Sequence, residues 1–169
     1  MPSELSPSAR RVQEALATQG LPGRVVELPQ TTRTAVDAAR AIGCEVAQIV
    51  KSLVFRGARS DRAYLVLVRG VDRVDESRLA EIIGEPVARA NANYVRARTG
   101  FAIGGVPPIG HREPLPILID AALLEMPELW AAAGTPHAVF RVLPSELLRI
   151  TGGRVVEVRT LQEPWEPGP

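Results

Sequence analysis

The chain has 169 residues, of which 46% are hydrophobic and 23% charged, and its net charge at pH 7 is +1. These values are typical of one globular domain with a proper core, and the small net charge excludes binding of nucleic acid through overall charge. No apolar run approaches the roughly 18 residues of a membrane span, and the N-terminus lacks the apolar core of a secretion signal. A single cysteine, which cannot form an internal disulfide, fits a reducing compartment. We therefore expect a cytoplasmic protein with no membrane association.

The first seventy residues predict two helices followed by a hairpin. Ser6, with Pro7 behind it, begins a helix that ends at Gly20, and Thr34 begins a helix that ends at Gly43. A first strand is expected at 23–28. After a helical turn at 44–50, two β-rich runs at 51–57 and 61–70 enclose a short polar loop, which is typical of a hairpin.

The rest of the chain continues with short elements in no strict alternation. Helices are expected at 76–84, 91–99 and 144–153, and strands at 85–90, 115–120, 129–136, 137–143 and 154–159. About seven strands mixed with five helices predict a mixed α/β domain with a largely antiparallel sheet. We place this single domain at residues 1–160 and expect 161–169 to be a flexible tail.

Familiar catalytic motifs are absent from the sequence. It contains no phosphate-binding P-loop, no dinucleotide-binding glycine motif, no G-x-S-x-G and no H-E-x-x-H. Two histidines and one cysteine are too few for a zinc site, so we expect neither a metal nor a cofactor. Cys44 follows a helix-ending glycine with no activating neighbour in sequence, which favours a packing role.

A glycine- and proline-rich loop, "TGFAIGGVPPIGH" at 99–111, is the densest local anomaly. Gly104 and Gly105 would allow the backbone to approach a ligand, and two prolines would stiffen the turn that follows. Such a loop can present fixed N–H groups to a developing oxyanion. The alternative is a rigid turn between a helix and a strand.

Three further residues have both a structural and a functional interpretation. Gly134 belongs to a Gly-Thr-Pro turn between two strands, and His137 begins the second of them. Asp120 ends a strand, where a carboxylate either caps the next turn or reaches into a cleft. The structural alternative is favoured for both His137 and Asp120.

Lys51 is the only lysine in a chain with nineteen arginines. It lies in the apolar run "IVKSLVF", where a helical turn leads into a strand. An arginine would extend its charge to water equally well, whereas a compact ammonium fits a tight pocket beside one oxygen better than a planar guanidinium does. We interpret Lys51 as a candidate site residue; the alternative is a lysine whose charge simply reaches solvent.

Four pieces of the sequence together resemble the YbaK/ProX family of freestanding aminoacyl-tRNA deacylases, which are related to the editing domain of bacterial prolyl-tRNA synthetase. The pieces are "TRTAVDAARAIGCEVAQIVKSLVF", "TGFAIGGVPPIGH", "PILIDAAL" and "AGTPHAVF", in the family's order and spacing. The resemblance implies a curved sheet and a pocket for the 3′-terminal aminoacyl-adenosine of a mischarged tRNA. It also implies hydrolysis of the aminoacyl ester without a protein nucleophile or metal, in trans, and on small amino acids attached to tRNA for proline.

The resemblance assigns Lys51, Gly104 and Gly105 to catalysis. Further residues of the matching pieces are expected to contact the substrate: Thr34, Ile103, Val106, Pro107, His111, Asp120, Gly134 and His137. Four arginines near the glycine loop could form a local phosphate-binding patch: Arg89, Arg96, Arg98 and Arg112. The expected partners are mischarged tRNA and prolyl-tRNA synthetase. Two alternatives are a binding module of the same fold without turnover, and a hydrolase of another small ester or nucleotide conjugate.

Overall fold

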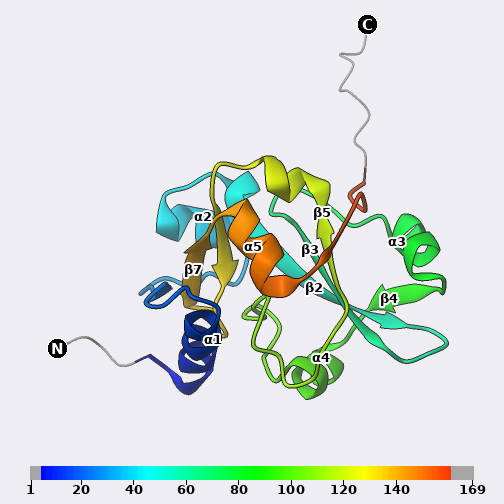
Figure 1. The fold of residues 1–169 in the computed structure, drawn as a ribbon, viewed down its shortest axis with the longest axis horizontal. Helices are drawn as coiled ribbons and strands as arrows, with labels where there is room; N and C mark the ends of the chain where they lie inside the picture. The colour runs from blue at the N-terminus through cyan, green and yellow to red at the C-terminus, as the bar shows by residue number, and fades with distance from the viewer. Residues whose placement is uncertain (1–4, 161–169) are drawn as a thin grey trace, which may run out of the picture.

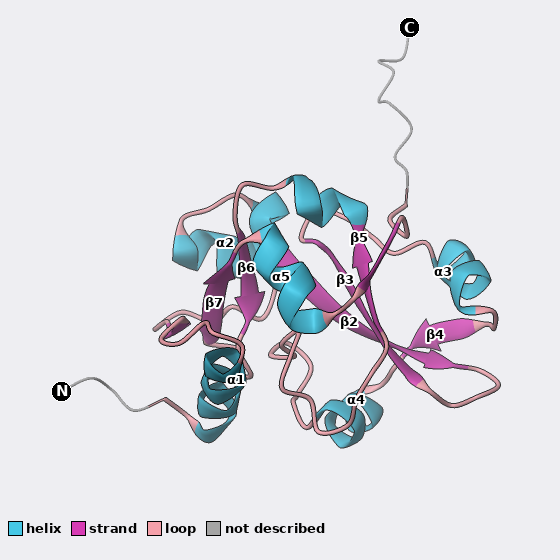
Figure 2. Ribbon diagram, viewed as in Figure 1, coloured by secondary structure: helices cyan, strands magenta, loops and turns pink. Residues whose placement is uncertain are grey.

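All eight described strands join in one sheet in the computed structural model, which describes residues 5–160. Their order is β1-β7-β6-β2-β3-β5-β8, and β4 pairs with β2 outside this path (Figure 2). The strands are β1 Val25–Glu27, β2 Ile49–Gly57, β3 Ala63–Arg69, β4 Val87–Arg89, β5 Ile117–Asp120, β6 Leu129–Ala132, β7 Ala138–Val142 and β8 Arg154–Val156. Four pairings are antiparallel and three are parallel, so the sheet is mixed, as predicted.

The described residues also form five α-helices and two short 3₁₀ helices. They are α1 Pro7–Thr18, α2 Ala35–Ile42, η1 Val46–Gln48, α3 Glu76–Ile83, α4 Ala92–Thr99, η2 Ala121–Glu125 and α5 Pro144–Thr151. The predicted helix starts are confirmed, and the predicted ends agree to within two residues. At α2, for example, the Thr34 hydroxyl accepts a hydrogen bond from the Asp37 N–H at 3.0 Å, and Gly43 ends the helix with φ +85°.

Helices cover both faces of the sheet, which explains why β3 is buried almost throughout. Successive side chains of a strand point to opposite faces. Leu65 and Leu67 of β3 join a core cluster with α1, α4 and α5, whereas Tyr64, Val66 and Val68 join a second cluster with Leu79 of α3. Figure 1 shows α1, α4 and α5 around the nearer side of the sheet and α3 beside the β4 end.

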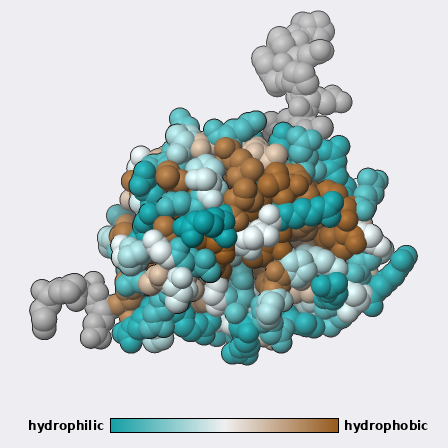
Figure 3. All heavy atoms as spheres, in the orientation of Figure 1, coloured by the Kyte–Doolittle hydropathy of each residue, from teal (hydrophilic) through white to brown (hydrophobic). Residues whose placement is uncertain are grey.

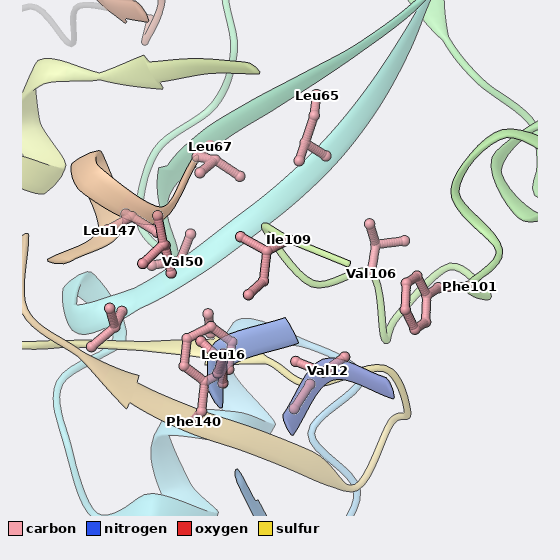
Figure 4. Close-up of a cluster of buried hydrophobic side chains, with 14 of the residues drawn as sticks. Val12, Leu16, Val50, Leu65, Leu67, Phe101, Val106, Ile109, Phe140 and Leu147 are labelled. Carbon is pink, nitrogen blue, oxygen red and sulfur yellow. The ribbon is translucent and has the colours of Figure 1, made fainter. Parts of the chain in front are cut away.

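The larger cluster fixes the loop that follows α4. Phe101, Val106 and Ile109 of this loop are buried among side chains from α1 and the sheet (Figure 4). Burial of such side chains contributes about 1.5–3 kcal/mol each, so the glycine-containing segment is anchored on both sides. Phe101, Val106 and Ile109 of this loop are therefore part of the core.

The predicted hairpin is confirmed by seven consecutive antiparallel pairs between β2 and β3, in which Lys51 lies opposite Val68. The two runs at 129–136 and 137–143 also pair as expected, as β6 and β7.

No helix within residues 5–160 has the length and apolar character needed to cross a membrane. On the face drawn in Figure 3, polar side chains surround an apolar area. The predicted tail, 161–169, lies outside the described residues.

Candidate active site

A cavity of about 320 Å³ lies beside β2, where the sheet is interrupted. One edge of β2 pairs with β3 along most of its length. The other edge pairs with β6 only at Ile49 and Val50, and with β4 only from Phe55 to Gly57. The stretch 51–53 therefore has no partner strand on this edge among the described strands, whereas the Val54 carbonyl accepts a hydrogen bond from the Ala90 N–H at 3.0 Å. The cavity occupies this gap, with residues of β2, β4, β6, α2 and the glycine loop in its wall.

Lys51 lies in the wall of this cavity. Its side chain is half-buried, and its ammonium donates a hydrogen bond to the main-chain carbonyl of Asp72. Burial lowers the pKa of Lys51 below its usual value of 10.5; the charge of Asp72 opposes this effect, while Arg89 and Arg73 add to it. An ammonium has three N–H donors, so two remain for a bound molecule. The one hydrogen bond found for this ammonium within residues 5–160 thus leaves its charge only partly satisfied.

The two glycines of the loop have different surroundings. Gly104 lines the cavity at φ +95°, and no protein acceptor for its N–H is found within residues 5–160. Gly105 does not line it: its N–H donates to the Ala102 carbonyl at 3.0 Å and its carbonyl accepts from the Gly134 N–H at 2.9 Å. A Cβ on Gly105 would lie 2.8 Å from backbone atoms of Thr135. Gly104 is therefore the candidate oxyanion donor, and Gly105 joins two loops closely.

Of the predicted substrate-binding residues, three line the cavity with Lys51 and Gly104: Thr34, Ile103 and Val106. Thr34 is the exposed N-cap of α2, which brings the first turn of that helix to the cavity. Ile103 is 48% exposed at the loop, and Val106 is buried behind it. The motif pieces around 34, 51 and 104 thus meet at one place, although they lie far apart in the sequence.

The other predicted residues lie outside this lining. His111 donates a hydrogen bond through Nε2 to the Pro107 carbonyl at 2.7 Å and borders a separate hollow against α1. Burial lowers the pKa of His111, and the bond to Pro107 only partly opposes this. Gly134 supports Gly105 through the bond described above. His137 is exposed, and its Nδ1 lies 3.1 Å from the Gln30 carbonyl.

Asp120 has the structural role favoured by the sequence. It is fully buried at the end of β5, and its carboxylate accepts bonds from the N–H groups of Ala122 and Val158 and from Arg159. Burial raises the pKa of Asp120, but these hydrogen bonds outweigh it and leave the pKa below its usual value. Asp120 therefore ties η2 and the chain after β8 to the sheet.

The four predicted phosphate-binding arginines do not form one patch at the cavity. Arg89 lines the cavity. Arg98 is paired with Asp61 at 3.2 Å and with Glu113 at 3.6 Å, so its charge is already compensated. Arg96 and Arg112 are exposed away from the cavity lining.

Sequence reasoning missed most of the cavity lining, including Arg33, Ser52 and Trp130. Arg33 is exposed and its side chain lies over Gly104, so that a Cβ added to Gly104 would lie 3.2 Å from Arg33 Cγ. Ser52 Oγ and Trp130 Nε1 are buried without a hydrogen-bond partner among the described residues, and both residues line the cavity. Unpaired buried polar atoms are uncommon and often mark functional sites. The position of Arg33 beside Thr34 was the only available sequence signal.

Metal ligands and a reactive thiol are not found at the cavity. No group of three or more acidic, histidine or cysteine side chains within residues 5–160 could hold a metal ion. Cys44 is partly buried in a small apolar cluster with α2, and burial raises the pKa of its thiol. A raised pKa makes the thiol less reactive, in agreement with a packing role.

The family model described as "Aminoacyl-tRNA editing domain" matches residues 29–150. The chain belongs to the aminoacyl-tRNA editing domain family. The expected family and the expected class of activity, aminoacyl-tRNA deacylation, are thereby confirmed. The matched region includes every residue of the cavity wall.

Similar proteins extend this comparison over nearly the whole chain. A crystal structure described as "a putative trans-editing enzyme for prolyl tRNA synthetase" is 54% identical, has a TM-score of 0.87, and covers 93% of this chain and 99% of its own. The uncharacterised protein YwhH of Bacillus subtilis is 28% identical over 78% of this chain and 83% of its own length. The "Putative Cys-tRNA(Pro)/Cys-tRNA(Cys) deacylase EbsC" of Enterococcus faecalis is 26% identical over 75% of this chain and 77% of its own length.

Proposed function

We propose that this editing domain acts in trans on tRNA for proline that carries a small non-cognate amino acid, and that it hydrolyses the ester in the cavity beside β2. The observation that carries the proposal is that Lys51 and Gly104 line the same, mostly apolar cavity. The relative described as a trans-editing enzyme for prolyl-tRNA synthetase supports the choice of tRNA. Prolyl-tRNA synthetase, which would release such a tRNA, is then the expected protein partner.

The reaction needs few groups from the protein. A water oxygen attacks the ester carbonyl carbon, the carbonyl oxygen gains negative charge, and the bond to the ribose oxygen then breaks with transfer of a proton to that oxygen. Positioning and stabilisation of the oxyanion can account for much of the rate of such a reaction. In our proposal the Gly104 N–H meets the carbonyl oxygen, and Lys51 holds that oxygen or one of the terminal adenosine. The neighbouring ribose hydroxyl assists the water.

Specificity for small amino acids would follow from the walls of the cavity. Small and branched apolar side chains form much of the lining, including Ala38, Val50, Ala131 and Val139. An additional methylene in such a pocket changes binding by only about 1–3 kcal/mol. We therefore expect a preference among alanine, serine, threonine and cysteine, with proline disfavoured by size and shape.

The test is single-turnover hydrolysis of tRNA for proline charged in turn with alanine, serine, threonine, cysteine and proline. We expect at least one small residue to be released about tenfold or more faster than proline, and Lys51→Ala to abolish the difference. Binding without release would instead favour the non-catalytic module. Hydrolysis of simple amino-acid esters but of none of the charged tRNAs would favour the other hydrolase.

Contacts with tRNA phosphates should be few. Arg33 and Arg89 line the cavity, and Arg96 and Arg112 are exposed elsewhere, so three or four contacts would give a log–log salt slope of roughly −2 to −3.5. Arg89→Gln should make this slope shallower by about 1. Arg98→Gln serves as the matched control, because Arg98 is already paired with Asp61 and Glu113. A slope near −8, or equal effects of the two variants, would contradict the expectation of three or four phosphate contacts that include Arg89.

A further inference from the structure

The ammonium of Lys51 is held by a turn that has its own ion pair. The turn runs from Arg69 to Asp72, immediately after β3, and the Asp72 N–H donates to the Arg69 carbonyl at 2.9 Å. The Arg69 guanidinium also bonds both carboxylate oxygens of Asp72, through Nε at 2.7 Å and Nη2 at 3.1 Å. A bidentate arginine–carboxylate pair restricts orientation as well as distance. The main-chain carbonyl of Asp72, which accepts the bond from Lys51, is therefore held from two directions.

The same turn is fixed against the entrance of β2. The Gly70 N–H donates to the Ile49 carbonyl at 2.8 Å, and a Cβ on Gly70 would lie only 2.4 Å from the Val46 carbonyl oxygen. Because only a glycine permits this approach, the turn lies directly on η1. Side-chain exposure in the ion pair is 26% for Arg69 and 10% for Asp72, so the pair is better shielded from solvent than a surface ion pair.

We propose that the Arg69–Asp72 pair is a positioning device for Lys51. The pair orients the Asp72 carbonyl, this carbonyl takes one of the three ammonium N–H groups, and the other two are thereby directed to the substrate. Neither Arg69 nor Asp72 lines the cavity, so they act through Lys51. The inference rests on the proposed function only for its effect on rate; the positioning of Lys51 is testable without any substrate.

The charged groups around Lys51 determine how removal of the Arg69–Asp72 pair should change the pKa of Lys51. Asp72 favours the charged ammonium, while Arg73 and Arg89 disfavour it, and Arg33 lines the same cavity. Asp72→Asn should therefore lower the pKa of Lys51. Arg69→Met removes a cation and leaves the carboxylate without its partner, so it should raise this pKa. The double variant should return it toward the wild-type value.

The single lysine makes this measurement unambiguous. Incorporation of [ε-¹³C]lysine gives one side-chain signal in this sequence, and its chemical shift against pH reports the Lys51 pKa directly. The matched control is the Arg56–Asp61 ion pair at the opposite end of the same hairpin, removed by Arg56→Met and Asp61→Asn. We expect the control variants to leave the Lys51 signal unchanged. Circular dichroism and melting temperature establish that each variant is folded.

Rate measurements distinguish positioning from electrostatics. Single-turnover deacylation should fall on the order of 10- to 100-fold in Asp72→Asn, in Arg69→Met and in the double variant, because misplacement of a catalytic group by about 1 Å has effects of this size. The double variant is decisive: its Lys51 pKa returns toward wild type while its rate stays low. The alkaline limb of the pH–rate profile should move with the measured pKa in each single variant.

Several results would overturn the proposal. A Lys51 signal and rate equal to wild type in both single variants would show that the pair does not hold the ammonium. An altered pKa with a rate within about twofold of wild type would show that positioning by the pair is irrelevant to the reaction. If wild type deacylates no charged tRNA, the proposed function fails, and the titration alone decides whether the pair holds Lys51. Should Asp72→Asn not fold, Arg69→Met, which retains the backbone bond of the turn, carries the test.

Discussion

A charged side chain lies at each end of the β2–β3 hairpin, and the two differ in how fully they are hydrogen-bonded. At the loop end, the Glu85 carboxylate accepts bonds from the N–H groups of Arg59 and Ser60, the Ser60 hydroxyl and the Tyr64 hydroxyl. These bonds lower the pKa of Glu85 from 4.5 to about 2, with the Ser60 side chain as the largest cause. At the cavity end, Lys51 has one carbonyl acceptor and a pKa lowered by burial.

The comparison distinguishes the Glu85 carboxylate, which stabilises the fold, from the Lys51 ammonium, which is available to bind or react with a substrate. Folding favours the charged form of Glu85, because every bond it makes is lost when the carboxylate is protonated or the loop opens. Folding disfavours the charged form of Lys51, so its presence requires another explanation. A binding or catalytic role would explain why the Lys51 ammonium lies in a cavity wall with only one hydrogen-bond acceptor.

Lys51→Arg should sharpen this comparison most. A guanidinium keeps the charge but is longer and planar, so we expect it to fail in the pocket almost as badly as Lys51→Ala, with rates lower by on the order of 10²-fold or more. The measurement is single-turnover deacylation by folded variants of equal melting temperature. An arginine variant within about threefold of wild type would mean that Lys51 is an ordinary surface cation.

Gly104→Val should have the next largest effect, lowering the rate by on the order of 10²–10³-fold with little loss of fold. A β-branched side chain is strained at φ +95° and would enter the cavity, where it also meets Arg33. Gly105→Val should differ, since its side chain collides with the backbone at Thr135, and we expect it to destabilise the protein as well. Measurements of deacylation and melting temperature together test both expectations. Near-normal turnover in a folded Gly104→Val protein would mean that the loop has only a structural role.

Glu85→Gln should change stability and leave deacylation within about twofold of wild type. The folded-state pKa is depressed, so the contribution of the carboxylate is present above pH 4.5 and is lost as the pH falls toward 2. The melting temperatures of wild type and variant should therefore differ at pH 7 and converge as the pH falls from 4.5 to about 2. A difference that is constant with pH would show that the hydrogen-bond geometry, and not the charge, stabilises the loop.

Cys44→Ala and treatment with EDTA should have the smallest effects on turnover. Cys44 packs beneath α2, and the proposed reaction uses water positioned by Lys51 and Gly104. We expect single-turnover rates within about twofold of the untreated wild type in both cases. Complete loss of activity in either would contradict a mechanism without a thiol nucleophile or a metal.

Much of the fold could be predicted because local signals agreed with tertiary packing. Helices with a capping residue and a terminal glycine, such as Thr34 and Gly43, were found at their observed positions. The run that became β3 is apolar up to its last residue, Arg69, as expected of a strand buried on both faces. The three parallel pairings, such as β2 with β6, were not predictable, because they join segments far apart in the chain.

The candidate site was predicted where the residue type was unusual and missed where it was not. A lone lysine and a double glycine are visible in sequence, whereas Arg33 is one of nineteen arginines and Trp130 resembles a core residue. The difference between Gly104 and Gly105 depends on a contact with the 134–135 turn, which adjacent sequence cannot reveal. The Arg69–Asp72 pair likewise could not be assigned to the site from the sequence, because only the folded turn brings it next to Lys51.

The interruption of the sheet beside β2 has a consequence for self-association. An unpaired strand edge normally invites another chain to add to it, which leads to aggregation. Here the open stretch, 51–53, is short and lies inside a cavity whose walls include α2, β6 and the loop at 103–106. Because these walls stand beside the open edge, we expect a small polar group to fit there more readily than an extended chain. The protein can therefore keep an unpaired edge for a ligand without offering it to other copies of itself.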